Sequence, residues 1–136
     1  MTPFEMAKLH LLSGSLTRPW SESEYKILLS TDIIRFFYVE NGFLVGRLIG
    51  PDAEILNVIV HPKYRRLGKA RYLIDKFEKE AIKEGSSKCF LEVAESNSRA
   101  NKLYQSLNYL SVGKRKNYYE FVDGRKDNAS ILAKEI

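Results

Sequence analysis

The sequence contains very little cysteine and no long run of apolar residues. Its single cysteine, Cys89, excludes an internal disulfide and a metal site built from several cysteines. No apolar run approaches the ~20 residues that a membrane-spanning helix needs. No apolar segment follows a basic start, as it would in a secretory signal. These absences predict a cytoplasmic protein without a membrane partner.

The composition is typical of one compact globular domain. The chain has 136 residues, of which 44% are hydrophobic and 29% are charged, and this length suffices for a core of its own. No repeat, low-complexity tract or linker interrupts it. We therefore expect a single domain over residues 1–136, and we expect Cys89 to be a small residue of its core.

Positive charge exceeds negative charge, with a formal net charge of +5 and a pI near 9.3. This excess fits a nucleic acid partner, a phosphate-rich cofactor or an acidic protein surface, but it fits equally well a basic surface that is merely solvated. Many basic residues are spread along the chain. A denser group lies in one short segment and consists of Lys63, Arg65, Arg66, Lys69 and Arg71.

Turn signals and hydrophobic periodicity divide the chain into helices and strands. Thr2 and Ser21 each begin a capping box that predicts a short helix, and Asn41-Gly42 predicts a tight hairpin turn. In chain order we expect helices to about residue 12 and over 21–29, strands over 33–40, 43–49 and 53–60, a helix over 69–84, a strand over 88–94, a helix over 99–107, extended segments over 109–112 and 115–121, and a last strand over 129–133. The strand–helix–strand unit over residues 55–94 is one crossover. It predicts a mixed sheet with a parallel pair in the middle.

A strand, a basic turn and a helix start follow one another over residues 57–71. The apolar, β-branched run 55–60 predicts a buried strand, and Pro62 ends it because proline cannot donate to a ladder. The first N–H groups of the helix that begins near Lys69 have no partner within the helix, and the helix dipole is positive there. We therefore predict that this stretch binds a pyrophosphate.

Four motifs occur together at fixed spacings. The first is the segment 57–71, in which Arg-Arg-Leu-Gly-Lys-Ala at 65–70 follows a Gln/Arg-x-x-Gly-x-Gly/Ala pattern. The other motifs are Pro-Trp-Ser at 19–21, Leu-Glu-Val-Ala-Glu-Ser-Asn at 91–97 with Ala100 and Leu103-Tyr104, and Asn-Tyr-Tyr at 117–119 with Asp123-Gly124. In this combination the chain resembles the GNAT superfamily of acetyltransferases, and more closely its RimI and Ard1 group of protein N-terminal acetyltransferases. The resemblance implies an α/β (α+β) GNAT fold, in which a mixed central sheet with a splayed parallel pair is flanked by helices.

The resemblance implies acetyl-CoA as the cosubstrate and no metal. N–H groups over residues 66–71 would contact the pyrophosphate, and the strand before the loop would offer backbone groups to the pantetheine arm. The cofactor-binding residues are then Val58, Ile59, Val60, Arg65, Arg66, Leu67, Gly68, Lys69, Ala70, Arg71 and Asn97, of which Arg65, Arg66 and Lys69 would tune the affinity through their side chains. The same features also fit a glycine that only shapes a turn, a strand that only fills the core, and an asparagine that only caps a helix.

The resemblance implies two catalytic residues. Glu92 would be the general base that acts through water on the substrate ammonium, and Tyr104 would protonate the departing CoA thiolate. Alternation along the strand places Glu92 on the face opposite Leu91 and Val93, where a carboxylate is costly to bury unless it is paired or functional. The alternatives are a salt-bridged surface glutamate and a core tyrosine.

The resemblance also implies a loop and a hairpin that close over the substrate, with Pro19, Trp20, Tyr118 and Tyr119 as the substrate-binding residues. The implied function is acetylation of the N-terminal α-amino group of proteins by direct attack in a ternary complex, with a ribosomal protein among the candidate targets. The alternatives are acetylation of a small-molecule amine or a lysine side chain, and a non-catalytic module that binds CoA or RNA. We expect a protein or peptide N-terminus as the partner rather than nucleic acid, and a homodimer is left open.

The chain departs from this family at its start. The family's usual first strand, which precedes the first helix, has no counterpart in the sequence. We therefore expect the sheet to lack one edge strand and to expose residues 33–40, unless a partner covers them.

Overall fold

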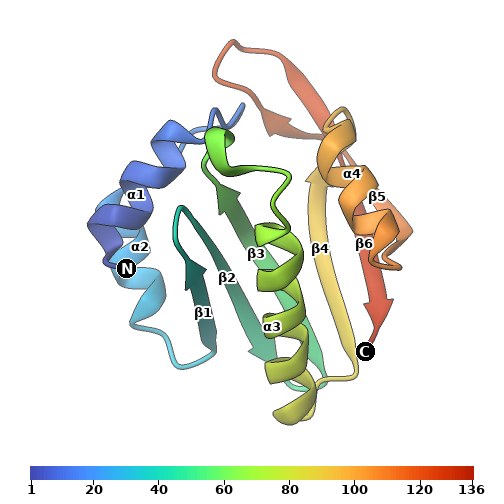
Figure 1. Cartoon of the computed structure of the whole chain (residues 1–136). Helices are drawn as coiled ribbons and strands as arrows, with labels where there is room; N and C mark the ends of the chain where they lie inside the picture. Colours follow the sequence, from blue (N-terminus) through green and yellow to red (C-terminus); the bar gives the residue numbers. More distant parts are fainter.

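The chain folds as helices packed on the two faces of one mixed β-sheet (Figure 1). This computed structural model describes residues 1–136. The elements, in chain order, are α1 (Pro3–Leu12), α2 (Glu22–Leu29), β1 (Ile34–Val39), β2 (Gly42–Ile49), β3 (Asp52–Val60), the short 3₁₀ turn η1 (Pro62–Tyr64), α3 (Lys69–Lys83), β4 (Lys88–Ala94), α4 (Ser98–Ser106), β5 (Leu110–Glu120) and β6 (Lys126–Glu135). The predicted helices and strands up to α4 are confirmed, with ends that differ by a residue or so. None of the helices has the length and apolar character needed to cross a membrane.

The six strands are ordered β1-β2-β3-β4-β6-β5, with β3 and β4 parallel and all other neighbours antiparallel. This confirms the predicted mixed sheet with a parallel pair in the middle. β3 and β4 pair only from Asp52 with Lys88 to Ile55 with Leu91. Beyond Ile55 the two strands diverge (Figure 1). The central pair is therefore splayed, and β1 and β5 form the edges of the sheet.

The first hairpin turns one residue earlier than predicted. Val39 pairs with Gly42, so Glu40 and Asn41 form the two-residue loop, and Asn41 takes the positive φ of 64°. Asparagine tolerates this left-handed conformation better than most residues. Gly42 instead lies within β2, where a Cβ would come to 3.3 Å from the Ile59 carbonyl oxygen. The glycine therefore serves close strand packing and not the turn.

The last two strands are longer and less regular than predicted. The extended segments 109–112 and 115–121 are one strand, β5, whose register against β6 shifts between Ser111 and Gly113 and again between Arg115 and Tyr119. Irregularities of this kind interrupt the two-residue alternation by which a strand is recognised in a sequence. The sequence pattern therefore predicted two short pieces in place of one irregular strand.

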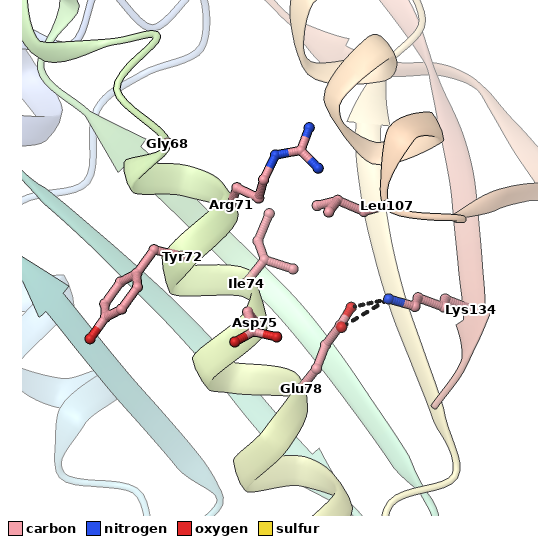
Figure 2. A pocket seen from close by; sticks show the side chains of 8 residues that line it. All are labelled: Gly68, Arg71, Tyr72, Ile74, Asp75, Glu78, Leu107 and Lys134. Atoms are coloured by element: carbon pink, nitrogen blue, oxygen red, sulfur yellow. Dashed lines mark hydrogen bonds and ion pairs between the residues drawn. The ribbon is translucent and has the colours of Figure 1, made fainter.

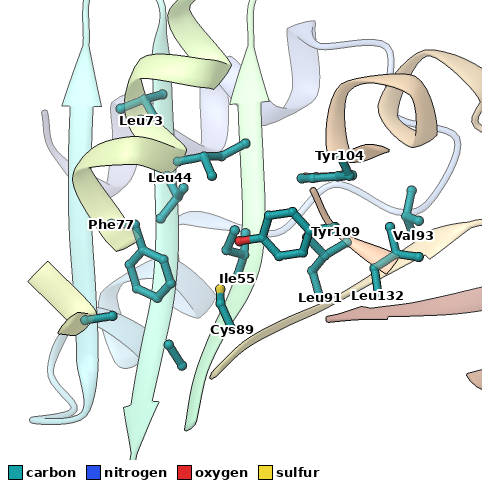
Figure 3. Packing of buried hydrophobic residues seen from close by; sticks show 13 residues of the cluster. Leu44, Ile55, Leu73, Phe77, Cys89, Leu91, Val93, Tyr104, Tyr109 and Leu132 are labelled. Carbon is teal, nitrogen blue, oxygen red and sulfur yellow. The ribbon is translucent and has the colours of Figure 1, made fainter. Parts of the chain in front are cut away.

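Alternation along the strands separates two apolar clusters, one on each face of the sheet. Leu44 belongs to the larger cluster beneath α3, with Phe77 and Leu91 (Figure 3). The neighbouring Phe43 faces the other way and packs in a smaller cluster with residues of α1 and α2. Cys89 lies fully buried in the larger cluster, and burial raises the pKa of its thiol to about 11. The prediction that it is a core residue is confirmed.

Candidate active site

The divergence of β3 from β4 leaves backbone groups of β3 without a strand partner on one side. Val58, Ile59 and Val60 pair with β2 on the other side, through Leu44, Phe43 and Gly42 respectively. The Val60 carbonyl oxygen accepts a hydrogen bond from Nε of Arg65 at 3.1 Å. The predicted pantetheine strand is thus open toward β4, with the exception of this carbonyl group.

The loop between β3 and α3 presents a row of unpaired hydrogen-bond donors. Arg66 and Gly68 have positive φ angles of 64° and 77°, and no N–H group from Arg66 to Arg71 donates to a backbone acceptor. The helical ladder starts only where the Tyr72 N–H donates to the Gly68 carbonyl at 2.9 Å. Unpaired N–H groups at a helix N-terminus bind anions, and these fit a pyrophosphate.

The Arg65 side chain points into the protein and bridges two segments. Besides the Val60 carbonyl, its guanidinium donates to the Ser13 carbonyl at 2.7 Å, just past the end of α1. Burial, and next the charge of Arg99, lower the pKa of Arg65. These contacts fix the start of the loop. Direct contact of this side chain with a cofactor stays a prediction, as it does for the other loop residues.

A pocket of about 430 Å³ opens between α3 and α4 and begins at the same loop (Figure 2). It is lined by Gly68, Arg71, Tyr72, Ile74, Asp75, Glu78, Leu107 and Lys134. Near its rim Arg71 donates to the Ser106 hydroxyl of α4 at 2.8 Å. At its other end Lys134 pairs with the buried Glu78 at 2.9 Å. Sequence analysis missed this ion pair. The available signal was the place of Glu78 on the buried stripe of α3, next to Phe77, where a carboxylate needs a partner.

Glu92 lies on β4 on the face opposite the α3 helix. Leu91 and Val93 are buried in the larger cluster, which confirms the predicted alternation. The Glu92 side chain is 22% exposed, and its carboxylate accepts from Nε of Arg115 on β5 at 2.9 Å. The glutamate therefore has a cationic partner and keeps some access to solvent.

A second cleft, of about 460 Å³, contains Glu92, Arg115 and Tyr118 among its lining residues. The Arg115 guanidinium lies 5.5 Å from the centroid of the Tyr118 ring. The negative charge of Glu92 raises the pKa of Tyr118. Sequence analysis missed Arg115, because its place beside Glu92 depends on the irregular register of β5.

Tyr104 on α4 lies on the other side of β4, within the larger cluster (Figure 3). Its ring meets that of Tyr109 edge-on at 5.8 Å. Tyr109 donates its hydroxyl proton to Glu78 at 2.7 Å, whereas the Tyr104 hydroxyl has no such partner. Burial, followed by the neighbouring Cys89 and Tyr119, raises the pKa of Tyr104, so the phenol stays protonated at neutral pH.

The two predicted catalytic groups thus approach β4 from opposite faces. Glu92 faces the second cleft, and Tyr104 packs with Leu91 and Val93 on the face covered by α3. Between β3 and β4 the sheet is open beyond Ile55. The opening is therefore flanked by a carboxylate on one face of the sheet and by a protonated phenol on the other.

Asn97 caps α4, because its side-chain oxygen accepts from the Ala100 N–H at 3.2 Å. The capping role considered from the sequence is confirmed, and a contact with the cofactor stays a prediction.

The segments predicted to bind the substrate are connected to each other. In the loop between α1 and α2, the Leu16 carbonyl accepts from the Val122 N–H of the β5–β6 turn at 2.8 Å. Tyr118 is exposed and Tyr119 half-buried on β5, with ring centroids 5.1 Å apart. Trp20 packs its ring at 5.5 Å from that of Tyr25. These contacts connect the loop to the β5–β6 turn and to α2.

These features define the class of protein. A family model described as the acetyltransferase (GNAT) family matches residues 8–109, and the chain belongs to this family of acetyl-CoA-dependent enzymes. The sequence is 33% identical over 134 residues to the [ribosomal protein bS18]-alanine N-acetyltransferase of Escherichia coli K12, covering 96% of this chain and 90% of that protein. It is 30% identical over 119 residues to the enzyme of the same name from Haemophilus ducreyi, covering 85% of this chain and 82% of that one.

Solved structures agree with the fold. The crystal structure of the ribosomal-protein-S18-alanine N-acetyltransferase from Escherichia coli superposes with a TM-score of 0.83 at 29% identity, over 96% of this chain and 84% of that one. Ard1 from Thermoplasma volcanium gives a TM-score of 0.83 at 22% identity, over 100% of this chain and 94% of that one. The predicted resemblance to RimI and Ard1 proteins is confirmed.

Proposed function

We propose that this chain acetylates the N-terminal α-amino group of a protein, with ribosomal protein bS18 as the first candidate substrate. The similarity to the Escherichia coli bS18-alanine N-acetyltransferase along 96% of the chain carries this proposal. The arrangement of Glu92 and Tyr104 on opposite faces of the splayed pair supports it.

The residues of the loop and of β3 would hold acetyl-CoA, which supplies the activated thioester when bound. The unpaired N–H groups from Arg66 to Arg71 would bind the pyrophosphate. Backbone groups from Val58 to Val60 would guide the pantetheine arm, and N–H groups there would polarise the thioester carbonyl. Asn97 would add a contact at the start of α4.

Proton transfer is assigned to two side chains. Glu92 would take a proton, through water, from the substrate ammonium, so that the free amine can attack the thioester directly. Tyr104, whose phenol is protonated and has no hydrogen-bond partner in the protein, would give its proton to the departing thiolate. Pro19, Trp20, Tyr118 and Tyr119 would form the wall around the substrate N-terminus. This reaction requires no metal.

A panel of acceptors with labelled acetyl-CoA tests the proposal, with mass spectrometry locating the acetyl group. It contains a bS18 N-terminal peptide, the same peptide with a blocked N-terminus, an internal lysine peptide and a polyamine. We expect acetylation at the free α-amino group only. Modification confined to lysine or to the polyamine would replace this proposal by one of the other amine substrates.

A thermal-shift series separates the enzyme from an RNA-binding module. Acetyl-CoA should raise the Tm, by about 2.7 kcal/mol of added stability at a hundredfold excess over its Kd. An RNA oligonucleotide should not raise it. Stabilisation by RNA that falls steeply with salt would contradict the expectation of no nucleic acid partner.

Further predictions accompany this proposal. We propose a single domain, a cytoplasmic location and the lack of the family's usual first strand. The position of β1 at the sheet edge supports the last of these. A homodimer stays open, and size-exclusion chromatography with light scattering would decide it.

A further inference from the structure

A buried histidine connects the substrate loop to the cofactor strand. His10, on α1, is 3% exposed. Its Nδ1 lies 3.0 Å from the backbone nitrogen of Trp20 and 2.8 Å from the hydroxyl oxygen of Tyr25. The Tyr25 hydroxyl in turn accepts from the side-chain amide of Asn57 on β3 at 3.3 Å. One hydrogen-bond network around this imidazole thus connects four segments of the chain, and Asn57 joins it through Tyr25.

The direction of each hydrogen bond follows from the groups involved. A backbone N–H can only donate, so the bond from Trp20 requires a lone pair on Nδ1 of His10. The Tyr25 hydroxyl must then donate to the same nitrogen while it accepts from Asn57. The imidazole is therefore neutral, with its proton on Nε2.

The surroundings keep the imidazole in this state. Burial, and next the charge of Arg18, lower the pKa of His10 to about 4, against a small opposing effect of Glu24. The rings of Trp20 and Tyr25 enclose it at 5.8 Å and 6.0 Å. At neutral pH Nδ1 thus remains available as an acceptor.

The two ends of the network lie at functionally important places. Asn57 follows the last pair between β3 and β4, Ile55 with Leu91, so it marks the start of the splayed segment. Trp20 belongs to the loop that is also hydrogen-bonded, through Leu16, to the β5–β6 turn. One polar network therefore relates the wall around the substrate to the strand that faces the cofactor.

We propose that His10 is a positioning residue for the peptide substrate, which it serves by fixing the backbone of the Trp20 loop relative to β3. This inference rests on the proposed function, since it takes the loop as part of the peptide site. His10 does not touch the reacting atoms. Its loss would misplace the peptide while the cofactor loop and the two proton-transfer groups remain in place.

The experiment compares Michaelis constants for peptide and for acetyl-CoA in three variants. His10→Phe keeps an aromatic ring but removes the acceptor, and we expect the peptide KM to rise about tenfold, the effect of one lost buried hydrogen bond. In the same variant, the KM for acetyl-CoA and the kcat should each change by less than about twofold. His10→Asn, whose side-chain oxygen can take the place of Nδ1, should recover most of the peptide KM.

Tyr25→Phe tests the link to β3 separately, because it removes the hydroxyl that joins His10 to Asn57 and leaves the Trp20–His10 bond intact. It should raise the peptide KM, but by less than His10→Phe does. An unchanged peptide KM in His10→Phe, or an equal rise for both substrates, would overturn the inference. If His10→Phe does not fold, His10→Gln replaces it, because its longer amide fills the pocket but reaches past the Nδ1 position.

A measurement without turnover separates this inference from the proposed function. Wild-type activity on the free N-terminal peptide tests the function, and if another amine is the acceptor, the same comparison is made with that amine. Nitrogen-15 NMR of the imidazole should show Nδ1 unprotonated at neutral pH and the Trp20 N–H protected from exchange. A protonated Nδ1, or a rapidly exchanging Trp20 N–H, would contradict the positioning role whatever the acceptor.

Discussion

At the residue scale, Glu92 combines partial burial, a cationic partner and an open cleft. We predict that Glu92→Gln lowers kcat about a hundredfold, as the loss of a general base does. The defect should be largest near neutral pH, where an α-amino group of pKa ~7.7–8.0 is still largely an ammonium, and should shrink at higher pH. Steady-state rates of thiol release from pH 6.5 to 9.5 measure it.

The matched control is Glu95→Gln. Glu95 follows β4 and pairs with Lys114 at 2.9 Å, just as Glu92 pairs with Arg115 of β5. Glu95 has no role in the proposed proton transfer, so the kcat of Glu95→Gln should equal that of the wild type. A pH–rate profile of Glu92→Gln that matches the wild type at every pH would refute the role of general base.

The two neighbouring tyrosines Tyr104 and Tyr109 differ in what their hydroxyl groups bind. Tyr109 donates to Glu78, whereas the Tyr104 hydroxyl has no hydrogen-bond partner in the protein. We predict that Tyr104→Phe slows turnover at least tenfold with little change in the Kd of acetyl-CoA. Tyr109→Phe should instead lower the free energy of unfolding by about 1–3 kcal/mol, because the buried Glu78 loses a donor. Calorimetric titration measures the Kd of acetyl-CoA in each variant, and urea unfolding measures the free energy of unfolding. If Tyr104→Phe loses affinity for acetyl-CoA without a slower turnover, Tyr104 is a binding residue and not a proton donor.

At the same scale, the sequence identified the candidate catalytic residues better than it identified the residues that contact or position the site. Glu92 and Tyr104 stand in recognisable motifs, and the structure leaves their roles as predictions with a consistent geometry. Arg115 and His10 stand in no motif that was recognised. Their importance depends on the register of β5 and on the packing of α1 against α2, which local patterns do not determine.

At the scale of elements, the cofactor loop depends on one side chain that is directed inward. Arg65 links the end of β3 to the residue after α1, whereas the neighbouring Arg66 is exposed. We predict that Arg65→Ala raises the Kd of acetyl-CoA about tenfold or more, because the loop loses its two backbone anchors. Arg66→Ala should raise it no more than about fivefold, the effect of one exposed charge.

Titration of both arginine variants with acetyl-CoA, at low and at high salt, distinguishes anchoring from charge. The Arg65→Ala defect should persist at high salt, since hydrogen bonds to carbonyl groups are screened little. The Arg66→Ala defect should vanish there. Equal and salt-dependent losses in both variants would mean that Arg65 acts only through its charge.

Elements with local signals were predicted most accurately. The capping boxes of Thr2 and Ser21 are both formed, and β4 begins and ends where alternation predicted. The first hairpin turn and β5 were predicted less well. In each case a residue adopts an unusual conformation or register, Asn41 in the turn and Ser111 to Gly113 in the strand, which propensity alone does not reveal.

At the scale of the whole molecule, the crossover from β3 through α3 to β4 explains both the core and the site. The parallel pair was predictable, because a strand–helix–strand unit implies it. The point at which the pair separates was not, because no local pattern marks Ile55 and Leu91 as its last partners. The docking of α3 on the sheet was not predictable either, because it depends on a close contact between β2 and α3.

Gly46 on β2 determines how closely α3 approaches the sheet. A Cβ at this position would lie 2.5 Å from Cζ of Phe77 and 3.0 Å from the Glu54 carbonyl oxygen. We predict that Gly46→Ala lowers the free energy of unfolding by about 1–3 kcal/mol, the usual cost of overpacking. Gly113→Ala is the matched control, since its Cβ would meet Ile131 at an ordinary 3.4 Å.

The double variant Gly46→Ala with Phe77→Leu tests whether the close approach is the cause. Phe77→Leu alone should also destabilise the protein, because it removes buried ring atoms from the larger cluster. Together the two changes should cost less than the sum of their separate effects, since the smaller side chain makes room for the methyl group. Urea unfolding of the four proteins measures this coupling. Strict additivity would show that the glycine serves the conformation of β2 rather than the docking of α3.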